Sequence, residues 1–305
     1  MSAMQPAVEI PRPAFSIVIP TLDRPEALRR CLESIADLEE PLGGFEVVVV
    51  DDGGRVDLEP VLTAFQDKFA LRLLRQSNAG PAAARNAGAT AARGDFLAFT
   101  DDDCRPSSGW LRALQARFAA DPSCAVTGRK SNLLQDNLCC CTSQAINDVL
   151  YSHFNARNGQ AGFVSTSSLA VPASGFREAG GFDPAFRTSE DREFGERWRA
   201  RGLRMVFAPE VVVFHAHPLT LGGLWRQHYE FGRGAFRFHR KHEAQGGQGL
   251  RPDLRFYRRL LWHPFEAQPF PASIALFACI LWAEVANASG YWREWLASAR
   301  SQPLT

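Results

Sequence analysis

Three consecutive aspartates, Asp101, Asp102 and Asp103, are the residues of this chain best placed to do chemistry. They follow directly after the apolar run at 96–100. Adjacent carboxylates repel one another, so their crowding should raise the pKa of at least one of them unless a cation is present. A divalent cation held by oxygen ligands would remove the repulsion. The alternative is a solvated turn in which the aspartates only cap a helix that begins near Ser107.

The elements that position these aspartates follow from a regular alternation of patterns. Short apolar runs alternate with segments of helical periodicity from Phe15 onward. This alternation predicts an α/β fold with a mostly parallel central sheet and helices on both faces. The predicted strands are "FSIVI", "FEVVVV", "LRLLR" and "DFLAFT", and the predicted helices cover 24–37, 58–69, 81–92 and 110–120.

Three polar clusters stand at the ends of predicted strands: "PTLDR" from Pro20, "DDGG" from Asp51 and "DDDC" from Asp101. Ligands of open α/β sheets bind at the carboxyl ends of the strands, so we expect the three clusters to line one crevice. Their carboxylates can have two different roles. One set would accept hydrogen bonds from a base or a ribose, and the other would hold Mg²⁺ or Mn²⁺ together with diphosphate oxygens.

Composition and missing motifs exclude several classes of function. The formal net charge of +1 provides no field for nucleic acid, and we expect no nucleic-acid partner. The chain has no G-x-G-x-x-G after its first strand, no Walker-type loop and no G-x-S-x-G elbow. Its seven cysteines form no C-x-x-C pair, and the first residues lack the pattern of a secretory signal. We therefore expect a cytoplasmic protein.

The second half of the sheet region is less regular. Residues 162–172 are predicted to form a strand or hairpin, and residues 203–218 a pair of short strands that ends at His215 and His217. A helix is predicted over 189–202, with Ser189 as its N-cap and Glu190 and Asp191 at the positive end of the helix dipole. Capping alone would explain Glu190.

Five segments in one order carry a family resemblance: "FSIVIPTLDRPEALRRCLESI", "FEVVVVDDGG", "NAGPAAARNAGATAARGDFLAFTDDDC", "GGFDPAF" and "SEDREFGERWRARG". Together they resemble family 2 glycosyltransferases of the GT-A fold, from Phe15 to His217. The resemblance implies a GT-A catalytic domain, which we place at 15–218. We expect an N-terminal tail at 1–14 before it and a helical C-terminal region at 219–305 after it. It also implies transfer of a sugar, with inversion, from a nucleotide-diphosphate-sugar donor to an acceptor hydroxyl.

The resemblance assigns roles on the donor side of the site. Pro20, Thr21 and Asp51 would lie against the nucleotide base with Asp52 nearby, and Arg85 would face the ribose or diphosphate, unless Arg85 is a surface charge. For the metal, Mg²⁺ or Mn²⁺, the resemblance implies that Asp103 is a direct ligand and that Asp101 is shared between ribose and metal. His215 is a further candidate ligand, with His217 as the fallback. Asp102 is left with a capping role.

On the acceptor side, Asp191 matches the general base of the family, against the alternative that it only caps its helix. Two positions depart from the family pattern, since Gly54 replaces a common serine and Ser168 a common asparagine. Neither removes a predicted ligand or the base. Two rival functions stay open: a nucleotide-sugar binding module without turnover, and a sugar-phosphate nucleotidylyltransferase.

The C-terminal region combines basic, aromatic and apolar stretches. Residues 225–234 are predicted to form a helix over the mouth of the site, with Arg226 or Arg233 meeting diphosphate, or else a solvated basic helix. The apolar segment 271–292 is interrupted by Glu284 and is predicted to be too short to span a bilayer. It is either a buried amphipathic helix or a helix in the membrane interface. The second alternative predicts peripheral contact with the inner face of the cell membrane and a lipid-linked acceptor, whereas a glycan acceptor requires no membrane.

Overall fold

The computed structural model describes residues 12–155, 160–247 and 252–300. The predicted N-terminal tail lies outside the described residues up to position 11. One sheet of eight strands, in the order β3-β2-β1-β4-β7-β6-β8-β5, forms the centre of the fold. The strands are β1 (Phe15–Thr21), β2 (Phe45–Asp51), β3 (Ala70–Arg75), β4 (Phe96–Phe99), β5 (Cys104–Pro106), β6 (Ala125–Asn132), β7 (Leu169–Pro172) and β8 (Met205–His215).

The mostly parallel sheet is confirmed. The pairs β1–β2, β2–β3, β1–β4 and β6–β8 are parallel, whereas β7 and β5 pair antiparallel with their neighbours. The carboxyl ends of β1, β2 and β4 therefore lie at one edge, as the polar clusters require. The pair of strands expected at 203–218 is a single strand, β8, whose pairing with β6 is irregular between Gly128 and Arg129.

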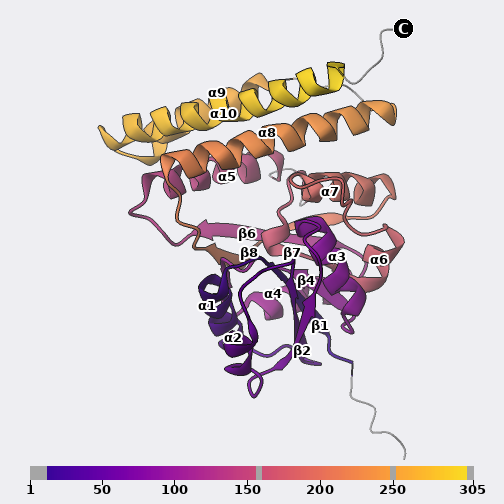
Figure 1. The fold of residues 1–305 in the computed structure, drawn as a ribbon. Coiled ribbons are helices and arrows are strands. Elements are labelled where there is room, and N and C mark those ends of the chain that lie inside the picture. The colour runs from indigo at the N-terminus through magenta and orange to yellow at the C-terminus, as the bar shows by residue number, and fades with distance from the viewer. Residues whose placement is uncertain (1–11, 156–159, 248–251, 301–305) are drawn as a thin grey trace, which may run out of the picture.

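Helices cover both faces of the sheet (Figure 1). Leucine, isoleucine and aromatic side chains of α1 (Pro25–Ala36), α2 (Glu59–Thr63) and α4 (Trp110–Ala120) share one buried cluster with β1 and β2. Alanine side chains of α3 (Pro81–Ala91) and aromatic side chains of α6 (Ala173–Glu178) and α7 (Glu190–Ala200) share a second cluster with β4 and β7. Helix α2 is shorter than the predicted 58–69, because the chain leaves the helix after Thr63. Leu62 is the buried residue of this short helix.

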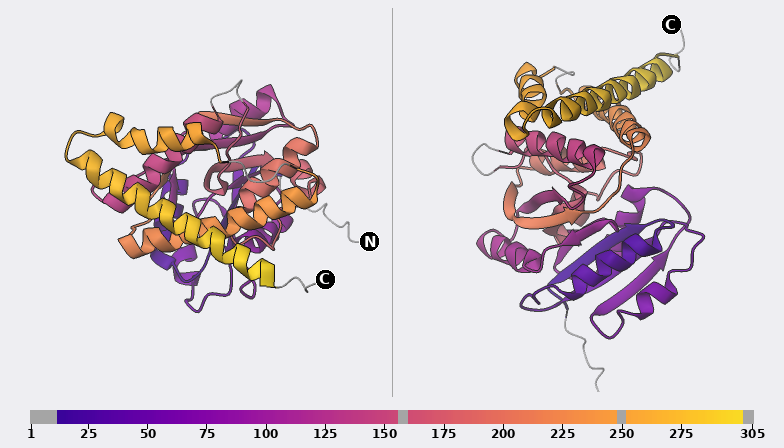
Figure 2. Two further views of the ribbon diagram at one scale, coloured as in Figure 1. Left: turned by 90° about the horizontal axis from the view of Figure 1, so that it is seen from above. Right: turned by 90° about the vertical axis from the view of Figure 1, so that its left-hand side faces the viewer.

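A second layer of helices lies beyond the sheet. It contains α5 (Leu138–Phe154), α8 (Leu221–Ala244), α9 (Leu254–Ala267) and α10 (Ala272–Arg300), which share a third apolar cluster. Figures 1 and 2 show α9 and α10 outermost, with α5 and α8 between them and the sheet. Helix α10 continues through Glu284. The prediction that the apolar segment is too short to span a bilayer was wrong, because the helix is long and apolar enough for that over 272–299 by length and composition. A single charged residue does not break a helix of good formers.

Candidate active site

The acidic loop after β4 is held against the end of β1. Asp102 is fully buried, and its Oδ2 accepts hydrogen bonds from Thr21 Oγ1 at 2.7 Å and from Arg24 Nε at 3.1 Å. Burial raises the pKa of Asp102 to about 7, although Arg24 and Thr21 oppose the rise. Asp102 thus fastens the loop to β1, and the prediction that it only caps a helix was wrong. Helix α4 begins at Trp110, beyond the intervening strand β5.

Asp103 faces two imidazoles. Cys104 pairs with His215 across β5 and β8, which carries the end of β8 to the acidic loop. The carboxylate oxygens of Asp103 lie 3.4 Å from His215 Nε2 and 3.3 Å from His217 Nδ1. Burial would raise the pKa of Asp103, but hydrogen bonds from both histidines hold that pKa well below its ordinary value. The structure therefore brings both predicted histidines to one carboxylate.

This cluster fits a divalent cation. Oxygen and nitrogen ligand atoms of Asp103 and His215 lie within 4.8 Å of each other, together with the sulfur of Cys104. Burial raises the pKa of the Cys104 thiol well above its usual range. Soft sulfur is also not a preferred ligand of Mg²⁺ or Mn²⁺, which favour oxygen. Carboxylate oxygens suit Mg²⁺ or Mn²⁺, and imidazole nitrogen is a common ligand of divalent transition-metal ions. Arg24 NH1 also reaches Asp103, at 2.9 Å, and so lies beside the same carboxylate.

Arg85 connects the acidic loop to α7. It lies in α3, is 4% exposed, and donates from NH2 to Asp101 Oδ1 at 2.6 Å and from NH1 to Glu190 Oε1 at 2.8 Å. Arg85 is therefore not a surface charge. Glu190 is buried, and burial together with the neighbouring Asp191 raises its pKa to about 7. Capping alone does not explain Glu190, because its carboxylate is one half of a buried ion pair.

Asp191 lies half-buried beside Glu190 in the first turn of α7. Its Oδ1 accepts a hydrogen bond from the backbone N–H of Arg192 at 2.7 Å. Burial raises the pKa of Asp191, and the effect is opposed by the N–H groups of Arg192 and Thr166 and by the charges of Arg85 and Lys130. A raised pKa favours proton uptake, which suits a general base.

The predicted cap of α7 was wrong. Ser189 has a left-handed backbone with φ of 69° and makes no side-chain capping bond. Close packing surrounds this residue, since a Cβ built on Gly234 of α8 would lie 2.3 Å from Thr188 Oγ1 and 2.8 Å from Ser189 Oγ. The start of α7 is therefore packed tightly against α8.

The carboxylates after β2 organise two loops. Asp51 Oδ1 accepts from the N–H of Gly54 at 2.8 Å, and a Cβ at Gly54 would approach that oxygen to 2.7 Å. Glycine thus suits this turn where the family pattern has serine. Asp52 accepts from Gln76 Nε2 at 2.7 Å and from the N–H groups of Ala79 and Gly80 at 2.9 Å, which fixes the entry to α3.

Sequence models of two glycosyltransferase groups match the chain. The glycosyl transferase family 2 model covers residues 16–145, and the glycosyl transferase family group 2 model covers residues 101–297, more than half of the chain. The chain belongs to the family 2 glycosyltransferases.

Relatives with known names are also glycosyltransferases. The pre-mycofactocin glycosyltransferase of Mycobacterium tuberculosis is 31% identical over 217 residues, which are 68% of this chain and 43% of that protein. The validoxylamine A glucosyltransferase of Streptomyces hygroscopicus is 27% identical over 231 residues, which are 65% of this chain and 54% of that protein. The chain thus spans about half the length of these relatives.

Solved structures share the fold. A mannosyltransferase of Pyrobaculum calidifontis in complex with GDP-Man and Mn²⁺ matches with a TM-score of 0.64 and 20% identity, over 95% of this chain and 80% of that one. TarS 1-349 of S. aureus in complex with UDP-GlcNAc matches with a TM-score of 0.56 and 16% identity, over 95% and 93%. These likenesses confirm the GT-A fold of this family member.

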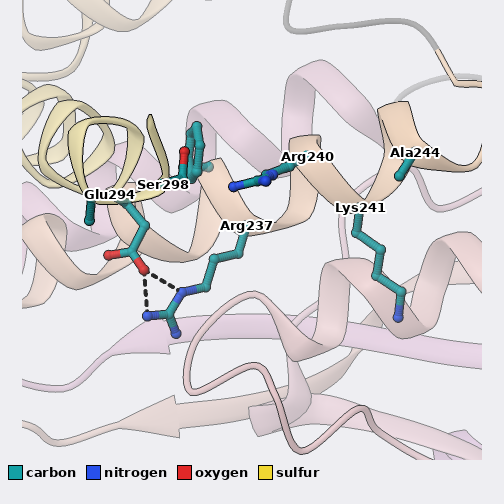
Figure 3. A pocket seen from close by; sticks show the side chains of 8 residues that line it. Arg237, Arg240, Lys241, Ala244, Glu294 and Ser298 are labelled. Atoms are coloured by element: carbon teal, nitrogen blue, oxygen red, sulfur yellow. Dashed lines mark hydrogen bonds and ion pairs between the residues drawn. The ribbon is translucent and has the colours of Figure 1, made fainter. Parts of the chain in front are cut away.

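The C-terminal helices differ from expectation near the site. Arg233 of α8 is bound to Glu230 at 3.1 Å and to Glu294 of α10 at 2.9 Å, so its guanidinium takes part in the α8–α10 contact. Arg226 is exposed on α8. A cavity of about 510 Å³ opens between α8 and α10, lined by residues such as Arg237, Arg240 and Lys241 (Figure 3). Its lining contains none of the predicted site residues.

Two residues of the site escaped the sequence reasoning. Arg24 binds both Asp102 and Asp103, and Glu190 binds Arg85. Arg24 stands in the quoted "PTLDR" cluster at a strand end, which was a usable signal. The sequence contains no comparable signal for Glu190, because an acidic residue in the first turn of a helix is typical of ordinary capping.

Proposed function

We propose that this protein is an inverting, metal-dependent glycosyltransferase that moves a sugar from a nucleotide-diphosphate donor to a hydroxyl of a glycan or lipid-linked acceptor. The observation that carries the proposal is the bridge made by Arg85. One guanidinium joins Asp101 of the acidic loop to Glu190, whose neighbour is Asp191. A donor-side cluster and a candidate base thus flank one site.

On the donor side, Asp103 and His215 would hold Mg²⁺ or Mn²⁺, with His217 beside them and Asp101 shared with the ribose. The cation would neutralise charge on the departing diphosphate. Pro20, Thr21 and Asp51 stand at the strand ends where the nucleotide base would lie, with Asp52 nearby. These nucleotide contacts are part of the proposal.

On the acceptor side, Asp191 would take the proton of the acceptor hydroxyl. The acceptor oxygen forms its bond to C1 of the sugar from the face opposite the diphosphate, the bond from C1 to the phosphate oxygen breaks, and nucleoside diphosphate leaves. The configuration at C1 is therefore inverted. Burial supports this role, because it raises the pKa of Asp191 toward the range where a base is effective.

A panel of nucleotide sugars tests the proposal. GDP-mannose and UDP-N-acetylglucosamine belong in it, because structural neighbours bind them. With Mn²⁺ or Mg²⁺ present, we expect slow release of free nucleoside diphosphate even when water is the acceptor. Release of pyrophosphate from a sugar phosphate and a nucleoside triphosphate would point to the nucleotidylyl reaction. Donor binding without turnover in all conditions would favour a binding module.

Location follows from the same proposal. The donor and the reduced cysteines suit a cytoplasmic protein, and all seven thiols are free of disulfides. A lipid-linked acceptor would bring the enzyme to the inner face of the cell membrane.

A further inference from the structure

The outward face of α10 is apolar along its length. Its exposed residues recur every three or four positions, so they form one stripe. Val285 is 54% exposed and Trp292 60% exposed. The stripe consists of Ile274, Ala278, Leu281, Val285, Ala288, Trp292, Leu296 and Ala299. A surface helix of a protein that meets only water normally carries polar residues at such positions.

Helix α9 and the turn before α10 continue this surface. Trp262 is 62% exposed and Phe270 is 79% exposed. The rings of Phe265 and Phe277 lie 5.5 Å apart, which joins the two helices side by side. Figure 2 shows both helices in the outermost layer of the molecule. We call the stripe together with Trp262, Phe265 and Phe270 the α9–α10 face.

Basic residues stand next to the apolar ones. Arg255 and Arg258 of α9 are exposed, and neither forms an ion pair with another described residue. Helix α9 carries three arginines and one acidic residue, Glu266, so its net charge is positive. Aromatic side chains beside unpaired arginines match the boundary between lipid headgroups and acyl chains, where anionic lipids complement the arginines.

Helix α10 is long and apolar enough to cross a membrane by length and composition, over 272–299. Its inner face, however, is fastened to the protein. A Cβ on Gly232 of α8 would lie 1.9 Å from the carbonyl oxygen of Asn287, and one on Gly290 would lie 1.9 Å from that of Tyr229. Glu294 also binds Arg233 and Arg237. A helix fastened along one face lies flat against the protein.

We propose that the α9–α10 face docks in the plane of an anionic lipid bilayer, with its aromatic side chains at the level of the headgroups. This docking is independent of the proposed reaction, because it requires no donor, metal or base. It places α8, and the start of α7 packed on α8, directly behind the bilayer-facing layer.

Flotation of the full chain with vesicles tests the docking. Vesicles of phosphatidylcholine alone are compared with vesicles that also contain phosphatidylglycerol. We expect binding to the anionic vesicles, weakened by salt. The double variant Trp262→Ser/Trp292→Ser should abolish it. Each of Arg255→Gln and Arg258→Gln should weaken it about fivefold. The matched controls are Leu42→Ser, at an apolar residue that is 84% exposed outside the α9–α10 face, and Arg201→Gln at the end of α7.

Four outcomes would overturn the proposal. If the protein floats with neither kind of vesicle, the α9–α10 face does not bind a bilayer. The same conclusion follows if the tryptophan variant, with its fold intact by circular dichroism, floats as well as the unchanged protein. A dimer in light scattering that the tryptophan substitutions dissociate would assign the face to a second copy of the chain. Retention in the membrane after alkaline carbonate washing would replace in-plane docking by a spanning helix. Release by carbonate supports the proposal.

Discussion

Arg85 and Glu190 form a buried ion pair between α3 and α7, with NH1 and Oε1 2.8 Å apart and the two residues 105 positions apart in the chain. The same guanidinium holds Asp101, so the pair fixes the candidate base helix relative to the candidate metal loop. Because both partners are almost fully buried, neither can be removed without leaving the other charge uncompensated.

The first prediction concerns this pair. Arg85→Met should lower the free energy of unfolding by about 3–5 kcal/mol, because it leaves buried carboxylates without their partner. Urea titration measures the loss. The double variant Arg85→Met/Glu190→Met should recover part of it. Arg112→Met, which breaks an exposed pair with Glu39, is the control and should leave stability unchanged within error. Equal midpoints for Arg85→Met and the control would show that the pair contributes nothing.

Asp191→Asn should lower turnover by roughly 10²- to 10⁴-fold, because it removes the basic lone pair while keeping size. Donor affinity should change only a few-fold, since the proposed mechanism places Asp191 on the acceptor side of the sugar. Initial rates and calorimetry with donor measure the two effects.

The control for Asp191 is Glu196→Gln, on the same helix and half-exposed; its partner is the half-exposed His242 of α8, outside the candidate site. Glu190→Gln is unsuitable, because Glu190 is bound to Arg85. Turnover of folded Asp191→Asn equal to that of the control would leave Asp191 as a structural residue, with the base elsewhere.

Asp103→Ala should remove the metal-dependent part of nucleoside diphosphate binding, because Asp103 is the carboxylate on which both histidines converge. Calorimetry with GDP and UDP, with and without Mn²⁺, measures it. His215→Ala should weaken the metal effect more than His217→Ala, since His215 belongs to the tighter cluster of ligand atoms. Asp67→Ala, at an exposed carboxylate after α2, is the control. Metal-dependent affinity that survives Asp103→Ala would remove this residue from the site.

Glu284 should make stability depend on pH. Burial in α10 raises its pKa to about 7 from 4.5. Between these values the folded chain keeps the proton and the unfolded chain loses it, so the free energy of unfolding should fall as the pH rises from about 5 to 7 and stay level above. Glu284→Gln should flatten this fall and stabilise the protein at pH 8 by up to about 3 kcal/mol. Urea titrations at pH 5, 6, 7 and 8 measure it, and parallel curves for both proteins would contradict the expectation.

Gly290→Ala should loosen the contact between α8 and α10. The added Cβ would lie 1.9 Å from the Tyr229 carbonyl oxygen, so the helices must separate, at a cost of about 1–3 kcal/mol. Gly222→Ala in α8 is the matched control, because its nearest neighbour is 4.0 Å away. Helix propensity alone should make this control neutral or slightly stabilising. Thermal unfolding of both variants measures the difference, and equal melting temperatures would refute close packing at Gly290.

The sequence by itself determined the alternation of strands and helices, and with it the edge where Thr21, Asp51 and Asp101 meet. This was possible because buried parallel strands must be continuously apolar and parallel strands end on the same side. The same patterns placed helices α3 and α4 within a residue of their observed bounds. The individual roles of Asp103, His215 and Asp191 came only from the family resemblance.

Only the tertiary structure decided which charges are paired. Arg85 joins Asp101 to Glu190, Arg24 joins Asp102 to Asp103, and Arg233 turns to Glu294. The outward apolar face of α10 also depends on the tertiary structure. The sequence of 272–292 is apolar on nearly every side of the helix, and packing against α5, α8 and α9 determines which side is covered. Local patterns fix periodicity, whereas ion pairs between residues far apart in the chain depend on how the sheet brings its loops together.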